Sequence, residues 1–462
     1  MPKWQHNDHS ERLSKQDDVD HRRLVTLSIL GVALIVALAI TSALASLLFP
    51  ADHQLGVELR NATATIVFIG SYLTLAVGRI PGLSIDRAGI ALVGAGLMVA
   101  SGALSLDEAY AAVDFNTITL LLGIMIVVAN LRLSGLFAFI NARVIAHARR
   151  PIVLLTAIVL VSGIFSAFLV NDAICLVLTP LVLELTLVLG RRPVPYLLAV
   201  AMASNIGSTA TIGGNPQNIM IGSFSQIPYA TFALTLGPVA IIGLAVLLAL
   251  IPLFHADEIV GKLRLPASVP TAKINRALLL RALAATMALI VLFFAGVTPA
   301  KAAIIIAGLL LLTRRVKSRR VYALIDWSLL LMFIGLFIIV AGAQRALLGP
   351  ETIAAVDRLR LDHIPVLSAA TAVLSNLVSN VPAVLLLKPF VQALPDRDTA
   401  WMTVAMASTL AGNFTVIGSV ANLIVVQNAA ASGVAIGFWD YFRVGAPLTL
   451  ITLLIGTLWL WL

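Results

Sequence analysis

Two polar stretches interrupt an otherwise apolar sequence, and their residue types suit the binding of a small polar solute. They run from Ser204 to Asn218 and from Ser408 to Asn422, and both are rich in Gly, Ser, Thr and Asn. Glycines together with Pro216 weaken a continuous helix, so the backbone carbonyls freed there need new partners. Bound ions are such partners, and the N-terminal end of a half-helix carries partial positive charge that suits an anion. We therefore expect two helix breaks that hold an ion or a small anion.

The two stretches belong to an internal repeat. Residues 201–204 and 405–408 share the sequence Ala-Met-Ala-Ser, and the same offset superposes three further pairs: Thr211 on Thr415, Gly214 on Gly418 and Asn218 on Asn422. Upstream, residues 166–180 align with 375–389, with Ser, Asn and Pro coinciding. Several polar matches in register indicate two copies of one structural unit, which is typical of secondary transporters.

Each repeat also places polar residues where a helical hairpin is expected to turn. Asn171 and Asp172 lie at the first predicted tip, and Ser379 and Asn380 lie at the second. Asp172 is the most informative of them, because a carboxylate at bilayer depth costs about 2.5 kcal/mol or more unless it is paired, protonated or bound to a cation. Helix capping is the alternative. We favour work with a proton or coupling ion, since the repeat counterpart of Asp172 is the apolar Val381.

A plainer interpretation applies to the other polar residues taken singly. Ser and Thr in membrane helices more often pack against neighbouring helices than bind a solute. Packing alone does not require Gly-Gly-Asn-Pro within a span, so the breaks taken as a pair favour function. Lys388 either attracts an anion or extends its charged end from a hairpin arm toward the membrane surface.

The amino-acid composition indicates a membrane protein. Of 462 residues, 60% are hydrophobic and 11% are charged, whereas soluble domains contain about 25% charged residues. A spanning helix needs about 20 apolar residues. The apolar segments lack the strict alternation of barrel strands, so we predict an all-α polytopic membrane protein with about 11 transmembrane helices plus two re-entrant hairpins in two inverted repeats. The net charge of +9 falls between apolar runs, which indicates orientation in the membrane, and we expect no nucleic acid partner.

The predicted domains follow the apolar segments. We expect a cytoplasmic tail, a first half, a cytoplasmic linker and a second half, with one hairpin and one broken helix in each half. The boundaries are 1–23 for the tail, 24–254 for the first half with hairpin 152–190 and broken helix 194–224, 255–276 for the linker, and 277–462 for the second half with hairpin 364–394 and broken helix 400–430.

The distribution of Lys and Arg predicts the orientation. Six regions collect most of these residues and should face the cytoplasm: 1–23, 79–87, 132–150, 191–192, 262–276 and 314–320. Both ends of the first hairpin then lie inside, the second hairpin opens to the outside, and the N-terminus is cytoplasmic. Arg345, Arg358 and Arg360 fall outside and fit this scheme least well. We expect a multi-pass protein of the cell inner (plasma) membrane.

Other chemistries lack their motifs. None of the seven histidines forms an HExxH pair, and no GxxxxGK[ST] sequence is present. Cys175 is the only cysteine, so no intrachain disulfide or thiolate cluster can form. We therefore predict no enzyme, no catalytic residue, no resident metal and no cofactor. Energy should come from an ion gradient, with Na+ or H+ as the coupling ion, or from a separate ATPase subunit.

At these motifs the chain resembles the ion transporter superfamily, which includes arsenite permeases, citrate-type permeases, NhaD-type sodium/proton antiporters and divalent-anion/sodium symporters. Val170-Asn-Asp-Ala173, Leu178-Thr-Pro180 and the stretch from Asn205 to Asn218 carry the resemblance, which covers residues from about 60 to 462. Many relatives have an acid where this chain has Asn215 and a second proline where it has Gln217, which disfavours cation antiport.

The resemblance implies a scaffold domain that often forms a homodimer, and a transport domain that moves as an elevator. It also implies that the tips and breaks hold the substrate and the Na+ or H+. Carried over by position, and including the aligned Gly214 and Gly418, these residues are Asn171, Asp172, Thr211, Asn215 and Asn218 in the first repeat, and Ser379, Asn380, Asn413, Thr415 and Asn422 in the second.

Two functions stay open on the sequence. The first is a secondary transporter of a small-molecule anion or oxyanion, of organic acid, inorganic anion or arsenite type, coupled to H+ or Na+. The second is a sodium/proton antiporter in which Asp172 alone alternates between proton and cation. A channel or a membrane enzyme fits less well, because a pore needs no inverted pair of broken helices.

Overall fold

The computed structural model describes residues 54–77, 85–147, 149–260, 274–312, 316–347 and 358–462, together with a few single positions. The predicted N-terminal tail and most of the first predicted span, Leu24 to Leu48, lie outside the described residues. Every regular element described is a helix, which confirms the all-α prediction. Seven described helices are long and apolar enough to cross a membrane, and four shorter apolar helices accompany them.

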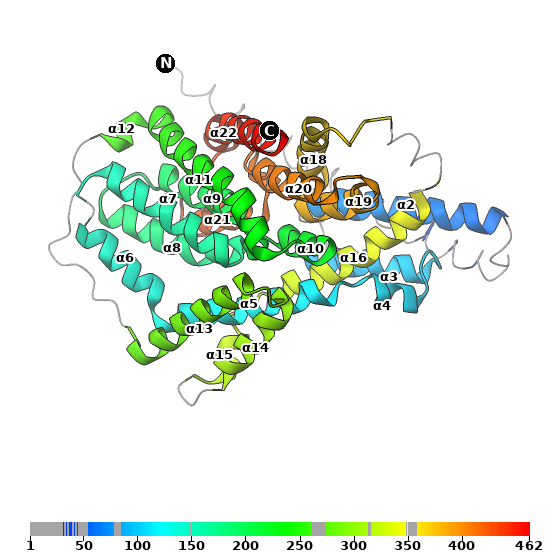
Figure 1. Cartoon of the computed structure of the whole chain (residues 1–462), viewed down its shortest axis with the longest axis horizontal. Helices are drawn as coiled ribbons and strands as arrows, with labels where there is room; N and C mark the ends of the chain where they lie inside the picture. The colour runs from blue at the N-terminus through cyan, green and yellow to red at the C-terminus, as the bar shows by residue number, and fades with distance from the viewer. Residues whose placement is uncertain are drawn as a thin grey trace, which may run out of the picture. The chain divides into compact units, whose positions relative to one another are not determined.

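The described residues divide into two compact units, whose helices are labelled in Figure 1. The first unit combines residues 1–113 with 327–354. Its helices are α2 (Gln54–Val77), α3 (Arg87–Ala100), α4 (Leu106–Ala112) and α16 (Trp327–Leu347).

Small residues let the helices of the first unit approach closely. Gly335 of α16 faces Ala91 of α3, where an added Cβ would lie 2.6 Å from the Ala91 backbone. Such small-residue contacts are the usual glue between membrane helices. Arg345 at the end of α16 pairs with Glu108 of α4 at 2.5 Å, so this arginine has an acidic partner within its own unit.

The second unit contains both predicted hairpins and both predicted broken helices. Its first part comprises α5 (Phe115–Ser134), α6 (Leu136–His147), α7 (Pro151–Phe168), α8 (Asn171–Val188), α9 (Pro193–Ser208), η1 (Ile212–Gly214), α10 (Pro216–Ser225), α11 (Tyr229–Phe254), α12 (Ala256–Ile259), α13 (Arg276–Phe294), α14 (Pro299–Leu311) and α15 (Ser318–Tyr322). Its second part comprises α18 (Ile364–Val378), α19 (Asn380–Ala393), α20 (Arg397–Ala411), η2 (Val416–Gly418), α21 (Val420–Ala431) and α22 (Phe438–Trp461).

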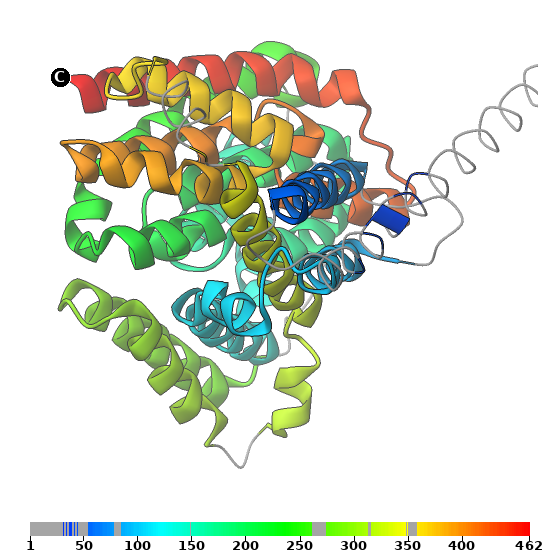
Figure 2. The same cartoon turned by 90° about the vertical axis from the view of Figure 1, so that its right-hand side faces the viewer.

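Helices α11 and α22 follow the broken helices of the two repeats and pack side by side in opposite directions. Trp459, near the end of α22, donates from Nε1 to the carbonyl of Thr235, near the start of α11, at 2.9 Å. Figure 2 shows the red α22 running along the orange α20, which precedes the second break. Corresponding helices of the two repeats are therefore antiparallel, as inverted repeats require.

Helix α6 is a difference from the sequence analysis, which treated residues 132–150 only as a basic cytoplasmic stretch. The structure has a helix from Leu136 to His147 that packs against α8 of the first hairpin. Its sequence is mostly apolar, and Arg143 is its one Lys or Arg residue. Basic content alone did not distinguish such a helix from a loop.

Candidate functional site

The first break begins where α9 ends and is shaped by two glycines and a proline. Helix α9 ends at Ser208, the short helix η1 covers Ile212–Gly214, and α10 begins at Pro216. Thr211 and Asn215 on either side of η1 are extended, with φ, ψ of −141°, 162° and −146°, 146°. A Cβ at Gly214 would lie 2.4 Å from the Ser208 carbonyl oxygen, so the backbone can approach this closely only at glycine.

The second break repeats this backbone path. Thr415 and Ser419 flank η2 with φ, ψ of −133°, 164° and −144°, 145°. Gly418 takes the place of Gly214, and its added Cβ would lie 2.9 Å from the Gly412 carbonyl oxygen. The two breaks therefore share one local geometry although their sequences share few residues.

One asparagine in each repeat bonds across its own break. Asn218 donates from Nδ2 to the carbonyls of Ser208 and Thr211 at 3.0 and 3.1 Å. Asn422 donates to the carbonyls of Gly412 and Thr415 at 2.7 and 3.1 Å, which are the same positions of the second repeat. Unwinding freed these carbonyls, and an unpaired carbonyl at membrane depth costs several kcal/mol. The amide nitrogens of both asparagines thus stabilise the breaks, and their oxygens face other partners.

Asn205, near the end of α9, joins the two repeats. Its Nδ2 donates to Asn413 Oδ1 and Asn422 Oδ1, both at 2.9 Å. Its Oδ1 accepts from Asn171 Nδ2 at 3.0 Å and from Ser419 Oγ at 3.1 Å. All five side chains are buried. We call these five residues the amide cluster.

A smaller set of contacts occurs at the symmetry-related position. Thr409 replaces Asn205 in the second repeat, accepts from Gln217 Nε2 at 3.0 Å and donates to Asn218 Oδ1 at 3.4 Å. With its amide oriented so that both atoms have partners, Asn380 donates to the carbonyls of Ser408 and Gly418 at 3.2 Å and accepts from Gln217 at 3.1 Å. Residues of the first break and of the second hairpin thereby meet.

The structure brings most of the predicted site residues into or beside these contacts. Thr211 donates to the carbonyl of Ala167 in the first hairpin, and Asn215 donates to Ser208 Oγ at 3.3 Å. Asp172 follows Asn171 in the first turn of α8 and is 7% exposed.

Two predicted residues are less buried than the rest. The backbone of Ser379 forms the turn between α18 and α19, with a φ of 76° that is rare for a residue other than glycine, and the residue is exposed. Thr415 is half-buried and contributes its carbonyl to Asn422.

Asn205, Thr409, Gln217 and Ser419 are not among the binding residues predicted from the sequence. Asn205 and Gln217 were visible as amides within an apolar repeat. Their partners in the other repeat are about 160 to 220 positions away, so only the fold reveals their importance.

The amide cluster is electrically neutral. Its members offer amide N–H groups, amide oxygens and one hydroxyl, and the nearest described acid along the chain is Asp172. Lys388 of α19 lies with Nζ 3.9 Å from the centre of the Phe224 ring of α10, so it packs against the first repeat as a cation on an aromatic face. Within the described ranges, no group of three or more His, Cys, Asp or Glu residues could hold a metal ion.

Paired hairpins, paired helix breaks and an antiparallel arrangement of the repeats define a polytopic membrane transporter. The chain belongs to the citrate transporter family, whose model matches residues 72–411. It thus lies within the ion transporter superfamily that its motifs resemble.

Individual proteins agree with this assignment. An uncharacterised transporter of Mycobacterium tuberculosis is 28% identical over 87% of this chain and 98% of its own. A silicon efflux transporter of rice, Oryza sativa subsp. japonica, is 29% identical over 84% of this chain and 96% of its own. The crystal structure of the YdaH transporter of Alcanivorax borkumensis has the same fold, with a TM-score of 0.52 at 13% identity over 94% of this chain and 97% of its own.

Proposed function

We propose that this protein is a secondary active transporter of a small anion or oxyanion, coupled to H+ or Na+ and working by elevator-type alternating access. The observation that carries the proposal is the buried amide cluster, in which one asparagine side chain binds residues of both inverted repeats. A carrier needs such a polar site built from both repeats, and in an elevator the segments that form it move together, so that the access to the solute changes.

The chemistry of the amide cluster restricts the kinds of solute that it can bind. No described side chain of the cluster carries a positive charge, and Asp172 is nearby along the chain. A tricarboxylate would need cationic partners to balance its charge in a buried site. A small oxyacid with several hydroxyl groups can instead exchange hydrogen bonds with amides and hydroxyls. We therefore favour an oxyacid of arsenite or silicic acid type over citrate, and the name of the rice relative supports this choice.

Asp172 is the residue that we assign to ion coupling. It is buried at the N-terminal end of α8, next to Asn171 of the amide cluster. A carboxylate in this position binds a proton or a cation more readily than it stays charged and solvated. The alternative function, sodium/proton antiport, would use the same carboxylate alone and would not need the amide cluster.

Transport by purified protein in liposomes tests the proposal. Arsenite, silicic acid and citrate are offered separately under a pH gradient, a Na+ gradient and no gradient. We expect gradient-driven accumulation of an oxyacid, and we expect Asp172→Asn to lose accumulation while it retains exchange of the solute across the membrane. Sodium-driven proton movement without any of these solutes, abolished by Asp172→Asn, would support the antiporter instead.

The remaining features of the proposal concern the setting of the protein. We propose a multi-pass protein of the cell inner membrane with a cytoplasmic N-terminus, which forms a homodimer through its scaffold helices. An ion gradient suffices for its energy, and a separate ATPase subunit would be an additional partner. Cysteine labelling from each side of intact cells and the mass of the detergent-solubilised protein test orientation and dimerisation.

A further inference from the structure

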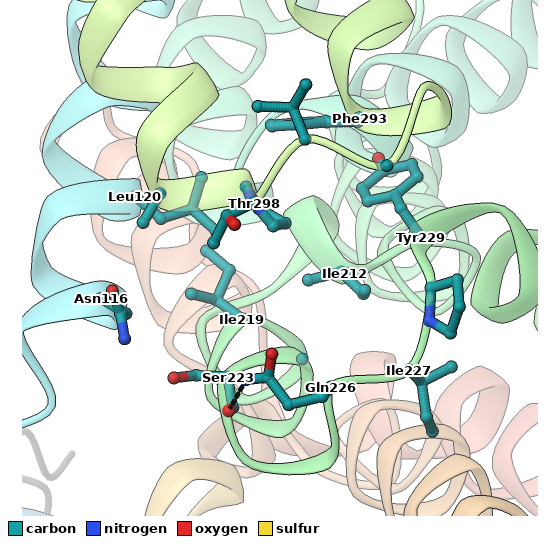
Figure 3. A pocket seen from close by; sticks show the side chains of 16 residues that line it. Asn116, Leu120, Ile212, Ile219, Ser223, Gln226, Ile227, Tyr229, Phe293 and Thr298 are labelled. Atoms are coloured by element: carbon teal, nitrogen blue, oxygen red, sulfur yellow. Dashed lines mark hydrogen bonds between the residues drawn. The ribbon is translucent and has the colours of Figure 1, made fainter.

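A cavity of about 250 Å³ lies beside the first break and is separate from the amide cluster. Its walls come from the start of α5, from η1, from α10 with the loop that follows it, and from the ends of α13 and α14 that face each other (Figure 3). Ile212 of η1 and Ile219 of α10 line it, so the cavity contacts another face of the segment that supplies Asn215 and Asn218.

The cavity changes from apolar to polar along its length. Its floor consists of buried apolar and aromatic side chains, which are Leu120, Ile212, Ile219, Tyr229 and Phe293. At the mouth, Asn116, Gln226 and Thr298 are exposed and Ser223 is half-buried. Figure 3 shows the rings of Phe293 and Tyr229 at one end and Ser223 and Gln226 at the other. None of the lining residues is charged.

This lining selects a particular kind of molecule. The rings of Tyr229 and Phe293, with centroids 4.9 Å apart, offer apolar and aromatic surface to a flat ring. Amides and hydroxyls at the mouth suit one uncharged hydrogen-bonding group, whereas a charged group would lose its hydration without an ionic partner. A cavity of about 150 Å³ holds one benzene ring, so the larger cavity accommodates about two fused rings.

We propose that this cavity is a second binding site, distinct from the transport site, for an uncharged, flat amphipathic molecule of about two fused rings. The cavity lies where α5, α11 and α14 begin and where α13 ends. The opposite ends of α5, α11 and α14 lead into the basic regions 132–150, 255–276 and 314–320, which are predicted to be cytoplasmic. The molecule therefore enters from the non-cytoplasmic side.

An occupant of this cavity also restrains the first break. Gly222 of α10 faces Ile212 so closely that an added Cβ would lie 2.6 Å from the Ile212 side chain, which couples η1 to α10. A molecule wedged between these elements and the ends of α13 and α14 holds them in one arrangement. This consequence rests on the proposed function: the molecule should lower the maximal transport rate without changing the KM for the solute.

Binding of 2-naphthol to the full-length protein in detergent tests the site. 2-Naphthoate, which has the same rings and a negative charge, is the control ligand. Ser223→Leu narrows the mouth of the cavity. Ser225→Leu, on the same helix, lies outside the lining and removes only the hydrogen bond that Ser225 Oγ accepts from the Ile227 N–H. We expect calorimetry to show a Kd for 2-naphthol that rises at least about tenfold in Ser223→Leu and less than about twofold in Ser225→Leu, with no binding of 2-naphthoate.

A density map of the wild-type protein with 6-bromo-2-naphthol gives a second measurement that needs no variant. Bromine density among the lining residues supports the proposal. A lipid acyl chain in the cavity, equal affinity in the two variants, or equal binding of 2-naphthoate overturns it. If the wild-type protein transports none of the solutes in liposomes but still binds 2-naphthol, the proposed function is contradicted and the second binding site is still supported.

Discussion

The two helix breaks have the same backbone path and different surroundings. Every residue from Thr211 to Asn218 is buried, whereas Thr415 is half-buried and Ile417 is 60% exposed. The hairpin turns differ in the same way, because Val170 is fully buried and its repeat counterpart Ser379 is exposed. A repeated backbone therefore does not impose equal access. Alternating access, as we propose it, needs this inequality, with one half covered while the other is open.

The sequences of the breaks account for part of the difference. The first break contains Gly213, Asn215 and Gln217, where the second has Ile417, Ser419 and Ala421. Amide side chains in the first break reach partners in the second repeat and become buried with them. The second break presents an apolar side chain outward at the position where the first has no side chain.

Removal of the Asn205 side chain should lower stability and transport rate more than any of the other substitutions. Asn205→Ala removes four hydrogen bonds to buried partners from both repeats, which costs about 3 kcal/mol or more of stability and lowers the transport rate below about 1% of wild type. Thr409→Ala, the matched change in the other repeat, disturbs fewer contacts and should retain about a tenth of the rate. Equal losses of stability and transport rate in the two variants would show that Asn205 is no more important than Thr409, its counterpart in the second repeat. Transport assays and thermal unfolding measure both.

Cysteine labelling tests the unequal access directly. In a Cys175→Ala background, a cysteine at Ile417 should react with a water-soluble maleimide at least about ten times faster than a cysteine at Ile212, which is 2% exposed. A saturating transported solute should change the ratio of the two rates. Equal labelling rates at the two positions in the absence of solute would contradict the unequal exposure of the two breaks.

The glycines of the two breaks should differ in their tolerance of a methyl group. A Cβ at Gly214 would lie within 2.9 Å of backbone atoms of Ser208 and Ser166, whereas at Gly418 the closest contacts are the Gly412 carbonyl at 2.9 Å and the Asn376 side chain at 3.1 Å. We expect Gly214→Ala to destabilise the protein by about 3 kcal/mol and Gly418→Ala by about 1 kcal/mol. The reverse order in chemical unfolding would contradict the geometry.

The smallest effect concerns the antiparallel contact between α11 and α22. Burial lowers the pKa of His255, and the nearby carboxylates of Asp440, Asp257 and Glu258 oppose this in part. The unfolded chain therefore takes up a proton at a higher pH than the folded protein does, so stability falls as the pH falls below about 6.5. His255→Gln should reduce the difference in Tm between pH 7.5 and 5.5 by about 1 °C. The exposed His363→Gln is the control, and an equal reduction there would contradict the assignment.

The fold was largely predictable because its signals are local. Apolar length, glycine and proline punctuation and the repeated Ser, Asn and Pro positions indicate helices, hairpins and breaks without knowledge of contacts. The pairing of Asn218 with Asn422 by alignment anticipated two side chains that make equivalent bonds in the structure. Their binding of a solute or ion stays a prediction.

The amide cluster was not predictable in the same way. A buried asparagine such as Asn205 looks in the sequence like any polar residue of a helix, and its importance depends on partners from the other repeat. The importance of Ser419 and Gln217 depends on partners from the other repeat in the same way. Helix α6 was missed because a basic stretch between spans is compatible with either a loop or a helix lying at the surface.

The asparagines that bridge their own breaks have a consequence for the empty protein. Because the backbone carbonyls of each unwound segment accept hydrogen bonds from an asparagine of the same repeat, the segment keeps its conformation before a solute binds. Solute binding then requires little ordering of the backbone, and the segments keep the same conformation after the solute is released. A carrier of this kind can reset unloaded, so the speed of its cycle need not depend on finding a solute for the return step.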